Sequence, residues 1–208
     1  MEDRLILSRQ RRERRQERKE LAAKSCYSII IVIVALVTLR PLMVDQILSR
    51  ADAYSAVGMV EESQRQCDKA LLIDDDNSQA WCRLARLCKS GGDRATAYAA
   101  YEKAVRAEST NRSAHYELAL MYVEDGKHQM AIPYLEQVRR LGPDRAKNGV
   151  IQRSSYHRDA LCLLVLCYQK VGDPDKTELN LKEMRVFYPD CGSPGDRLQP
   201  FSQNSLSH

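Results

Sequence analysis

Seven cysteines are the residues of this 208-residue chain best suited to metal or redox chemistry. Five residues separate Cys82 from Cys88 and four separate Cys162 from Cys167, whereas zinc sites typically use pairs separated by two. No histidine stands at a partnering distance from either pair in the sequence. Most of the cysteines fall where a helix interior is expected, and free cysteine there behaves as a small apolar residue. We therefore predict no metal site and no cofactor.

The other motifs that carry catalytic chemistry do not occur in the sequence. There is no G-x-x-x-x-G-K, no G-x-G-x-x-G, no H-E-x-x-H and no G-x-S-x-G. Asp74, Asp75 and Asp76 form an acidic run, but it lacks the glycine and glutamate of a calcium loop, so a solvated turn is expected. The four histidines are far apart in the sequence. We predict that the protein is not an enzyme and that it has no small-molecule partner.

The elements that hold these residues follow a repeat of 34 residues. Residues 78–111 align without gaps on residues 112–145, and residues 44–77 fall in the same frame. A fourth copy, at 158–191, follows an insertion at 146–157. Each copy has a glycine after its first predicted helix, where left-handed backbone is needed: Gly58, Gly92, Gly126 and Gly172. The pattern predicts an all-α fold built from stacked helix pairs.

This pattern resembles the tetratricopeptide repeat (TPR) family. In one copy the resemblance rests on Trp81, Leu84, Ala85, Gly92, Ala97, Tyr101 and Ala104. In the next copy it rests on Leu118, Ala119, Tyr122, Gly126, Ala131, Leu135 and Pro143. The resemblance implies an all-α, right-handed solenoid of about four helix pairs whose first helices line a concave groove. It also implies that the groove binds a protein or peptide partner.

The frame of the resembling family assigns side chains of the first helices to the groove. The predicted partner-binding residues are Gln79, Arg86, Lys89, Tyr116, Leu120, Val123, Cys162, Leu166 and Gln169. The first helices of the third and fourth copies are apolar on every side, and such helices must be covered on both faces. Two interpretations remain open: burial within the solenoid, or an apolar ligand groove centred on Tyr116, Leu120 and Leu166. In the second case, Leu120→Glu is expected to abolish partner capture without lowering the melting temperature.

An apolar segment precedes the repeats. Residues 25–44 contain a single charge, Arg40. Twenty helical residues span ~30 Å, which is the thickness of the hydrocarbon core of a bilayer. No small-x-small cleavage site follows the apolar run, as a cleaved signal peptide requires. The run has no polar face, which argues against a core helix. We therefore predict an uncleaved transmembrane signal anchor at 25–44.

The basic residues are concentrated before this segment. Residues 1–24 carry nine Lys/Arg and five acids, whereas the remaining residues carry 23 of each sign. Seven of the basic residues are predicted to orient the span and to contact lipid headgroups: Arg11, Arg12, Arg14, Arg15, Arg18, Lys19 and Lys24. The five interleaved acids and the lack of an aromatic residue in this tail argue against nucleic-acid binding.

The positive-inside rule predicts a cytoplasmic N-terminus, with the repeat domain on the far side of a membrane, such as a bacterial inner membrane. An oxidising exterior disfavours free thiols, which leaves three alternatives. The exterior is reducing, a pair such as Cys67 and Cys88 closes, or the topology is inverted.

The predicted organisation is a basic cytoplasmic tail at 1–24, a span at 25–44, a TPR domain at 45–190 and a disordered tail at 191–208. The predicted function is that of a membrane-anchored adaptor or scaffold. It holds a partner protein or peptide beside the membrane, in the assembly or quality control of an envelope complex. The alternative is a permanent structural subunit of a larger membrane protein complex.

Overall fold

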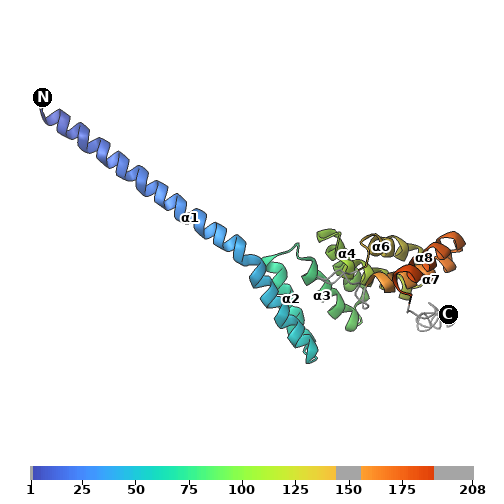
Figure 1. Cartoon of the computed structure of the whole chain (residues 1–208). Helices are drawn as coiled ribbons and strands as arrows, with labels where there is room; N and C mark the ends of the chain where they lie inside the picture. Colours follow the sequence, from blue (N-terminus) through green and yellow to red (C-terminus); the bar gives the residue numbers. More distant parts are fainter. Residues whose placement is uncertain (1, 144–155, 190–208) are drawn as a thin grey trace.

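The computed structural model describes residues 2–143 and 156–189, and every regular element within these ranges is an α-helix. The helices are α1 (Glu2–Ala56), α2 (Val60–Ile73), α3 (Ser78–Ser90), α4 (Arg94–Ala107), α5 (Arg112–Glu124), α6 (His128–Arg140), α7 (Tyr156–Val171) and α8 (Pro174–Phe187). Figure 1 shows α1 projecting as one long rod from an array formed by the other helices. The predicted all-α repeat array is confirmed.

The helices pack in chain order. Each helix contacts the next one along the chain from α1 to α8, and α5 also contacts both α3 and α7. The first helices of successive pairs therefore lie along one side of the array, while α4 and α6 lie behind them. This arrangement is that of a solenoid, in which each pair buries apolar surface against its neighbours.

The turn within each pair depends on a glycine in the left-handed backbone region. Gly92 has a φ of +85°, which a residue with a side chain rarely adopts. The amide of Asp93 then donates to the carbonyl of Cys88 at 2.9 Å, closing the end of α3. The carboxylate of Asp93 accepts from the amide of Thr96 at 3.0 Å and so caps α4. The predicted left-handed conformation holds at the equivalent glycine of all four copies.

The turn between pairs is tied by a capping asparagine. The side chain of Asn111 accepts from the amide of Ala114 at 3.0 Å and so caps α5. Its amide group donates to the hydroxyl of Ser78 at 2.6 Å, and Ser78 donates to the carbonyl of Ala104 at 2.9 Å. These bonds join α3, α4 and α5, which fixes the position of the third pair relative to the second.

The core runs through the array between the two layers of helices. Tyr101, Leu118, Leu135 and Leu161 are among its largest fully buried side chains. A second, smaller cluster joins the first two pairs and consists of Val44, Leu48, Ala70 and Ala80. The side chains of the C-terminal part of α1 are therefore core residues of the array.

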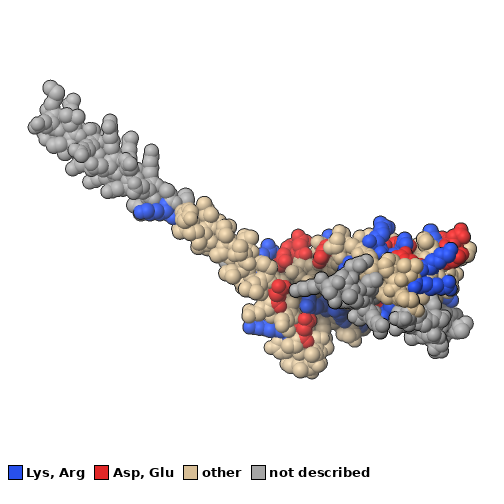
Figure 2. Space-filling model, viewed as in Figure 1, with Lys and Arg blue, Asp and Glu red and all other residues tan. Residues whose placement is uncertain are grey.

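The long helix α1 differs from the expectation of a span followed by a separate repeat helix. Its 55 residues form one α-helix that continues through Pro41 into the first repeat. Within the described residues, Ile30–Ala56 is the one stretch long and apolar enough to cross a membrane, and only 6% of its most apolar part consists of buried residues. Figure 2 shows this part of α1 as a surface without charged side chains, whereas both charge signs cover the repeats. The apolar stretch of α1 is therefore not a buried core helix in this structure.

Arg40 connects α1 to the end of α2. Its Nε donates to the carbonyl of Ile73 at 2.7 Å, and its Nη2 lies 3.1 Å from the carboxylate of Asp74. Asp74 follows α2 directly, as the acidic turn predicts. Arg40, the single charged residue of the segment 25–44, is therefore bound to the repeat array.

The C-terminal half differs from the sequence frame at one boundary. Helix α7 begins at Tyr156, two residues before the predicted start of the fourth copy at residue 158. The rest of the insertion and the tail predicted to be disordered, 191–208, lie outside the described residues.

Leu135→Ala is expected to lower the free energy of unfolding by about 2–5 kcal/mol, because this side chain in α6 is fully buried and its loss leaves a cavity. Leu72→Ala removes the same atoms from a side chain in α2 that is 87% exposed, and it is expected to change that free energy by less than about 0.5 kcal/mol. Urea denaturation of the purified chain followed by circular dichroism measures both. Equal losses for the two variants would contradict the burial described here.

Candidate functional site

A hollow lies on the side of the array formed by the first helices. It has a volume of about 370 Å³ and opens between α1, α3, α5 and the α4–α5 turn. Its lining is mostly polar and consists of Asp52, Gln79, Cys82, Arg83, Arg86, Glu108, Asn111 and Ser113. The repeat positions all of these residues, since they come from first helices or from a turn between pairs.

One wall of the hollow is an ion pair between the first two repeats. Arg83 donates from Nε to Asp52 Oδ1 at 2.8 Å and from Nη2 to Oδ2 at 2.9 Å. This two-bond geometry matches the planar guanidinium to the carboxylate. The hydrogen bond to Asp52 raises the pKa of Arg83. The Nη1 of Arg83 also donates to the side-chain oxygen of Gln79 at 3.3 Å, so this guanidinium is fully engaged within the protein.

Arg86 is held more loosely than Arg83. Its Nη2 donates to the hydroxyl of Ser113 at 2.5 Å, and the hydroxyl of Tyr156 lies 3.5 Å from the same nitrogen. The carboxylate of Glu117 lies 3.6 Å from Nε, beyond normal hydrogen-bond distance. The side chain of Arg86 is 46% exposed. Arg86 therefore donates hydrogen bonds to two hydroxyls and forms an ion pair with Glu117.

The thiol at the floor of the hollow is not a nucleophile at neutral pH. Burial raises the pKa of Cys82 to about 11, so the group stays protonated. The thiols of Cys67 and Cys88 are free and buried, so the disulfide considered between them is not formed. In the part of the chain that the structure describes, no three His, Cys, Asp or Glu side chains gather in a way that could hold a metal ion.

The structure separates the nine residues predicted to form the groove. Gln79 and Arg86 line the hollow. Lys89 lies beyond it, with its Nζ 2.8 Å from the carboxylate of Glu124. Gln169 is exposed in the last pair, beside a smaller hollow between α7 and α8.

The apolar members of the predicted set lie largely inside the array. Val123, Cys162 and Leu166 are buried. Tyr116 and Leu120 are half-buried and pack against the main core. Because α7 contacts α5, α6 and α8, its faces are covered by protein, and the structure does not present these side chains as an open apolar surface. Burial within the solenoid therefore accounts for the two apolar first helices.

This packing changes the result expected for Leu120→Glu. A carboxylate at Leu120 would face the main core, so the variant would lose stability as well as any contact with a partner. The substitution does not separate binding from folding. Arg86, which is exposed and belongs to the hollow, is the better position for such a test.

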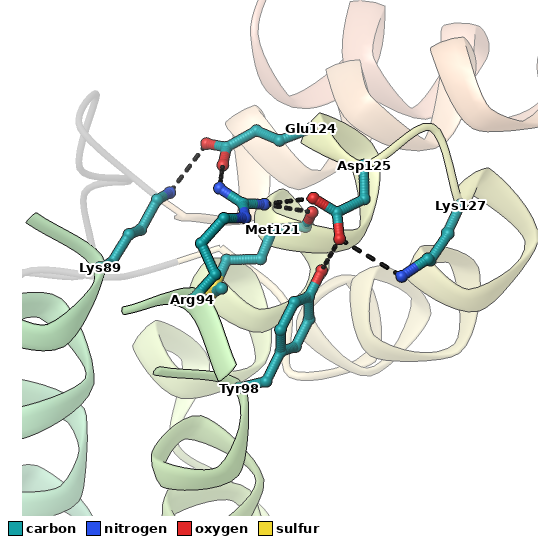
Figure 3. Close-up of polar contacts among 7 residues, drawn as sticks. All are labelled: Lys89, Arg94, Tyr98, Met121, Glu124, Asp125 and Lys127. Carbon is teal, nitrogen blue, oxygen red and sulfur yellow. Dashed lines mark hydrogen bonds and ion pairs between the residues drawn. The ribbon is translucent and has the colours of Figure 1, made fainter. Parts of the chain in front are cut away.

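A polar cluster fixes the second and third pairs at their far edge (Figure 3). It consists of Lys89, Arg94, Tyr98, Met121, Glu124, Asp125 and Lys127. Arg94, at the start of α4, donates to the carboxylate of Glu124 at 3.0 Å and to that of Asp125 at 2.5 Å. Tyr98 donates to the same carboxylate of Asp125 at 2.9 Å. Lys89, predicted to bind a partner, is part of this structural contact.

Sequence reasoning left Asp52, Arg83 and Ser113 out of the predicted binding residues. Asp52 and Ser113 occupy groove positions in the repeat frame, and Arg83 lies four residues after Gln79 on the same helix. A search for charged groups in the first helices, in place of apolar ones, would have found Asp52 and Arg83. The pairing of Asp52 with Arg83 depends on how α1 and α3 pack, which the repeat frame does not specify.

Comparisons with known proteins agree with this architecture. Residues 78–111 and 114–148 each match a family model described as tetratricopeptide repeat. These two segments are therefore TPR repeats, and TPR proteins mediate binding to proteins and peptides. The matched segments coincide with α3–α4 and α5–α6. No curated protein matches the sequence of the chain.

Three solved structures illustrate the structural likeness. MamA is 20% identical over 69% of this chain and 77% of its own, with a TM-score of 0.55. YrrB, described as a TPR protein with an unusual peptide-binding site, is 17% identical over 67% of this chain and 66% of its own, with a TM-score of 0.50. A mutant O-GlcNAc transferase from Thermobaculum terrenum is 26% identical over 72% of this chain, with a TM-score of 0.55, but only 27% of that enzyme is covered.

The edge cluster predicts a pH dependence of stability. Burial raises the pKa of Asp125, but the hydrogen bonds from Tyr98 and Arg94 lower it by more than burial raises it. The pKa of Asp125 therefore lies below its ordinary value. A lowered pKa stabilises the folded state above the unfolded pKa of about 3.9, and this contribution is lost as the pH falls through the folded value. We expect Asp125→Asn to reduce the loss of stability between about pH 5 and pH 2. Urea denaturation across this range measures the effect, and an unchanged slope would contradict it.

Proposed function

We propose that the chain is a membrane-anchored TPR adaptor that holds a protein or peptide partner beside the membrane. The observation that carries this proposal is the continuity of α1, which joins an exposed apolar stretch directly to the repeat array. The polar hollow on the array supports partner binding, because TPR proteins bind proteins and peptides there or on similar surfaces. An adaptor of this design restricts its partner to the vicinity of the membrane.

The finer parts of the proposal rest on charge. The excess of basic residues before the apolar stretch favours a cytoplasmic N-terminus and a repeat domain on the far side, in a bacterial inner membrane. In that location, the adaptor would act in the assembly or quality control of an envelope complex. Buried, protonated thiols react slowly with oxidants, so free cysteines in the array are compatible with an oxidising exterior.

A permanent structural subunit of a membrane complex is the second candidate. The observation that favours it is the large apolar exposure on the second helices, where Leu72 in α2 and Val186 in α8 are 87% and 75% exposed. Such side chains suit a surface that another subunit covers. Salt-resistant co-purification at fixed stoichiometry would support the subunit, and reversible capture below stoichiometry would support the adaptor.

Arg86→Glu is expected to lower partner recovery from gently solubilised native membranes at least about tenfold, because it reverses the exposed cation of the hollow. The substitution also removes the contacts of Arg86 with Ser113 and Glu117, so the melting temperature is expected to fall, and recovery is compared at a temperature at which the variant is folded. Arg65→Glu in α2 is the matched control, because Arg65 is exposed and lies outside the hollow. Equal recovery with Arg86→Glu and Arg65→Glu would contradict a role for the hollow.

Sidedness is tested with an introduced thiol. The native thiols at 67, 82, 88, 162 and 167 are buried and should react poorly, so Leu72→Cys is made in a chain that also carries Cys26→Ser and Cys191→Ser. A membrane-impermeant maleimide is expected to label this thiol from the far side in intact cells. Labelling that requires permeabilised cytoplasmic membranes would invert the proposed topology.

A further inference from the structure

We infer that a pocket between the α2–α3 turn and the end of α4 binds the zwitterionic headgroup of a phospholipid in the membrane that holds α1. The inference rests on the proposed function, because it requires α1 to be inserted in a membrane. Two observations carry it: the place of the pocket at the edge where α1 leaves the array, and the two signs of charge in its lining.

This α2–α4 pocket is separate from the hollow between α1, α3 and α5. It has a volume of about 380 Å³, and its lining shares no residue with that hollow. Asp75 and Asp76 belong to the turn between α2 and α3, and Trp81 lies near the start of α3. The rest of the lining comes from the last turns of α4 and consists of Lys103, Arg106 and Ala107. Every lining residue therefore lies in a turn or near the end of a helix.

These helix ends lie at the edge where α1 leaves the array. Arg40 of α1 binds the carbonyl of Ile73 and the carboxylate of Asp74, and Asp75 follows directly in the chain. Figure 1 shows this turn beside the point from which the exposed part of α1 projects. Because successive helices of the array run antiparallel, α3 begins and α4 ends at the same edge. The α2–α4 pocket therefore lies at the edge of the array that is closest to the membrane.

The pocket also lies at the depth of the lipid headgroups. Arg40 is the single charge of residues 25–44, and a guanidinium is unfavourable inside hydrocarbon, so the hydrocarbon boundary lies near it. The headgroup layer extends ~5–7 Å beyond this boundary. Trp81 is three residues from the start of α3, which is ~4.5 Å along the helix axis. The sole tryptophan of the chain therefore lies at the depth where tryptophan is enriched in membrane proteins.

The lining carries both signs of charge, on different elements. Asp75 and Asp76 come from the turn, whereas Lys103 and Arg106 come from α4. The phosphate of a phospholipid suits the two cations, and the ammonium of a zwitterionic headgroup suits the two carboxylates. A headgroup that carries only negative charge would meet the carboxylates without a counter-charge. The lining therefore favours a zwitterionic headgroup over an anionic one.

The contacts that the basic side chains make within the protein are weak enough to be exchanged. Lys103 Nζ lies 4.1 Å from the centroid of the Trp81 ring. Arg106 Nη2 lies 3.8 Å from the carboxylate of Glu102 on the same helix, and the Arg106 side chain is 72% exposed, so this pair contributes little. The indole itself is fixed, because Trp81 Nε1 donates to the carbonyl of Asp75 at 2.7 Å. The pocket therefore combines a fixed aromatic wall with two cations that can turn to a phosphate.

The sole tryptophan makes the pocket observable by fluorescence. The full-length chain is reconstituted in phosphatidylcholine vesicles that contain a small fraction of phosphatidylcholine with a spin label, either on the headgroup or deep in the acyl chain. The spin label quenches a nearby indole. We expect the headgroup label to quench Trp81 at least about twofold more than the acyl-chain label. In the control chain, Trp81→Phe and Met130→Trp move the tryptophan to an exposed position on α6, where neither label should quench it.

Substitutions of the basic residues test the phosphate contact. Lys103→Ala together with Arg106→Ala should lower quenching by the headgroup label at least about twofold. The matched control is Lys182→Ala together with Arg185→Ala, which removes the same charge from α8, outside the pocket, and should leave the quenching unchanged. Equal losses in the two double variants would overturn the phosphate contact.

A change of host lipid tests the choice of headgroup. In phosphatidylglycerol vesicles with the same labelled phosphatidylcholine, quenching of Trp81 should rise at least about twofold, because the anionic host competes poorly for the pocket. Asp75→Asn together with Asp76→Asn should remove this rise. Equal quenching of the wild-type chain in the two hosts would overturn the selection of a zwitterionic headgroup.

Flotation of the vesicles separates this inference from the proposed function. If the chain does not float with the vesicles, α1 is not an anchor and both proposals fail. If the chain floats but the headgroup label quenches Trp81 no more than a tryptophan at position 130, the lipid site is overturned and the adaptor function stands.

Discussion

The packing of one face of α1 against α2 and α3 is the interaction on which the rest of the architecture depends. Val44, Leu48 and Ala51 are buried there, so the C-terminal part of the long helix is the first helix of the array. A helix cannot rotate or shift along its axis at one end without moving at the other. The exposed apolar stretch and the first repeat therefore belong to one continuous helix, and the contact of Arg40 with the end of α2 adds a second point of attachment. Every later repeat takes its position from this first pair.

Much of the fold could be predicted from the sequence because a repeat reports the same information several times. Four glycines in one frame specify four left-handed turns, and one of them alone would have been ambiguous. The continuity of α1 could not be read in the same way. Pro41 and Arg40 look like a boundary between an anchor and a domain, since proline often ends a helix and arginine ends an apolar run. Tertiary contacts override both signals, because the residues after Pro41 gain burial only if they stay helical.

The candidate site was harder to predict than the fold for a physical reason. Apolar side chains on a first helix have the same periodicity whether they face a groove or a neighbouring helix, so Leu166 and Leu120 gave no indication of which face was open. Residues 160–168 of α7 are all buried, because α5, α6 and α8 pack against this helix. Charged side chains carry more information, since burial of an unpaired charge is costly. Arg83 and Arg86 each needed a polar side chain or solvent around the guanidinium. Arg83 bonds to Asp52, and Arg86 bonds to Ser113.

The edge cluster and the hollow lie on different parts of the same helices. Arg94, Glu124 and Asp125 join the second and third pairs at the edge where the turns within pairs lie. The hollow lies along α1, α3 and α5 and reaches the turn between α4 and α5 through Glu108 and Asn111. Ion pairs at the first edge can hold the curvature of the array without occupying the hollow. The hollow is also lined by contacts that fix the array, since the Asp52–Arg83 ion pair joins the first two pairs and Asn111 joins the next two. A substitution that leaves these contacts in place can therefore change the hollow while the pairs remain docked.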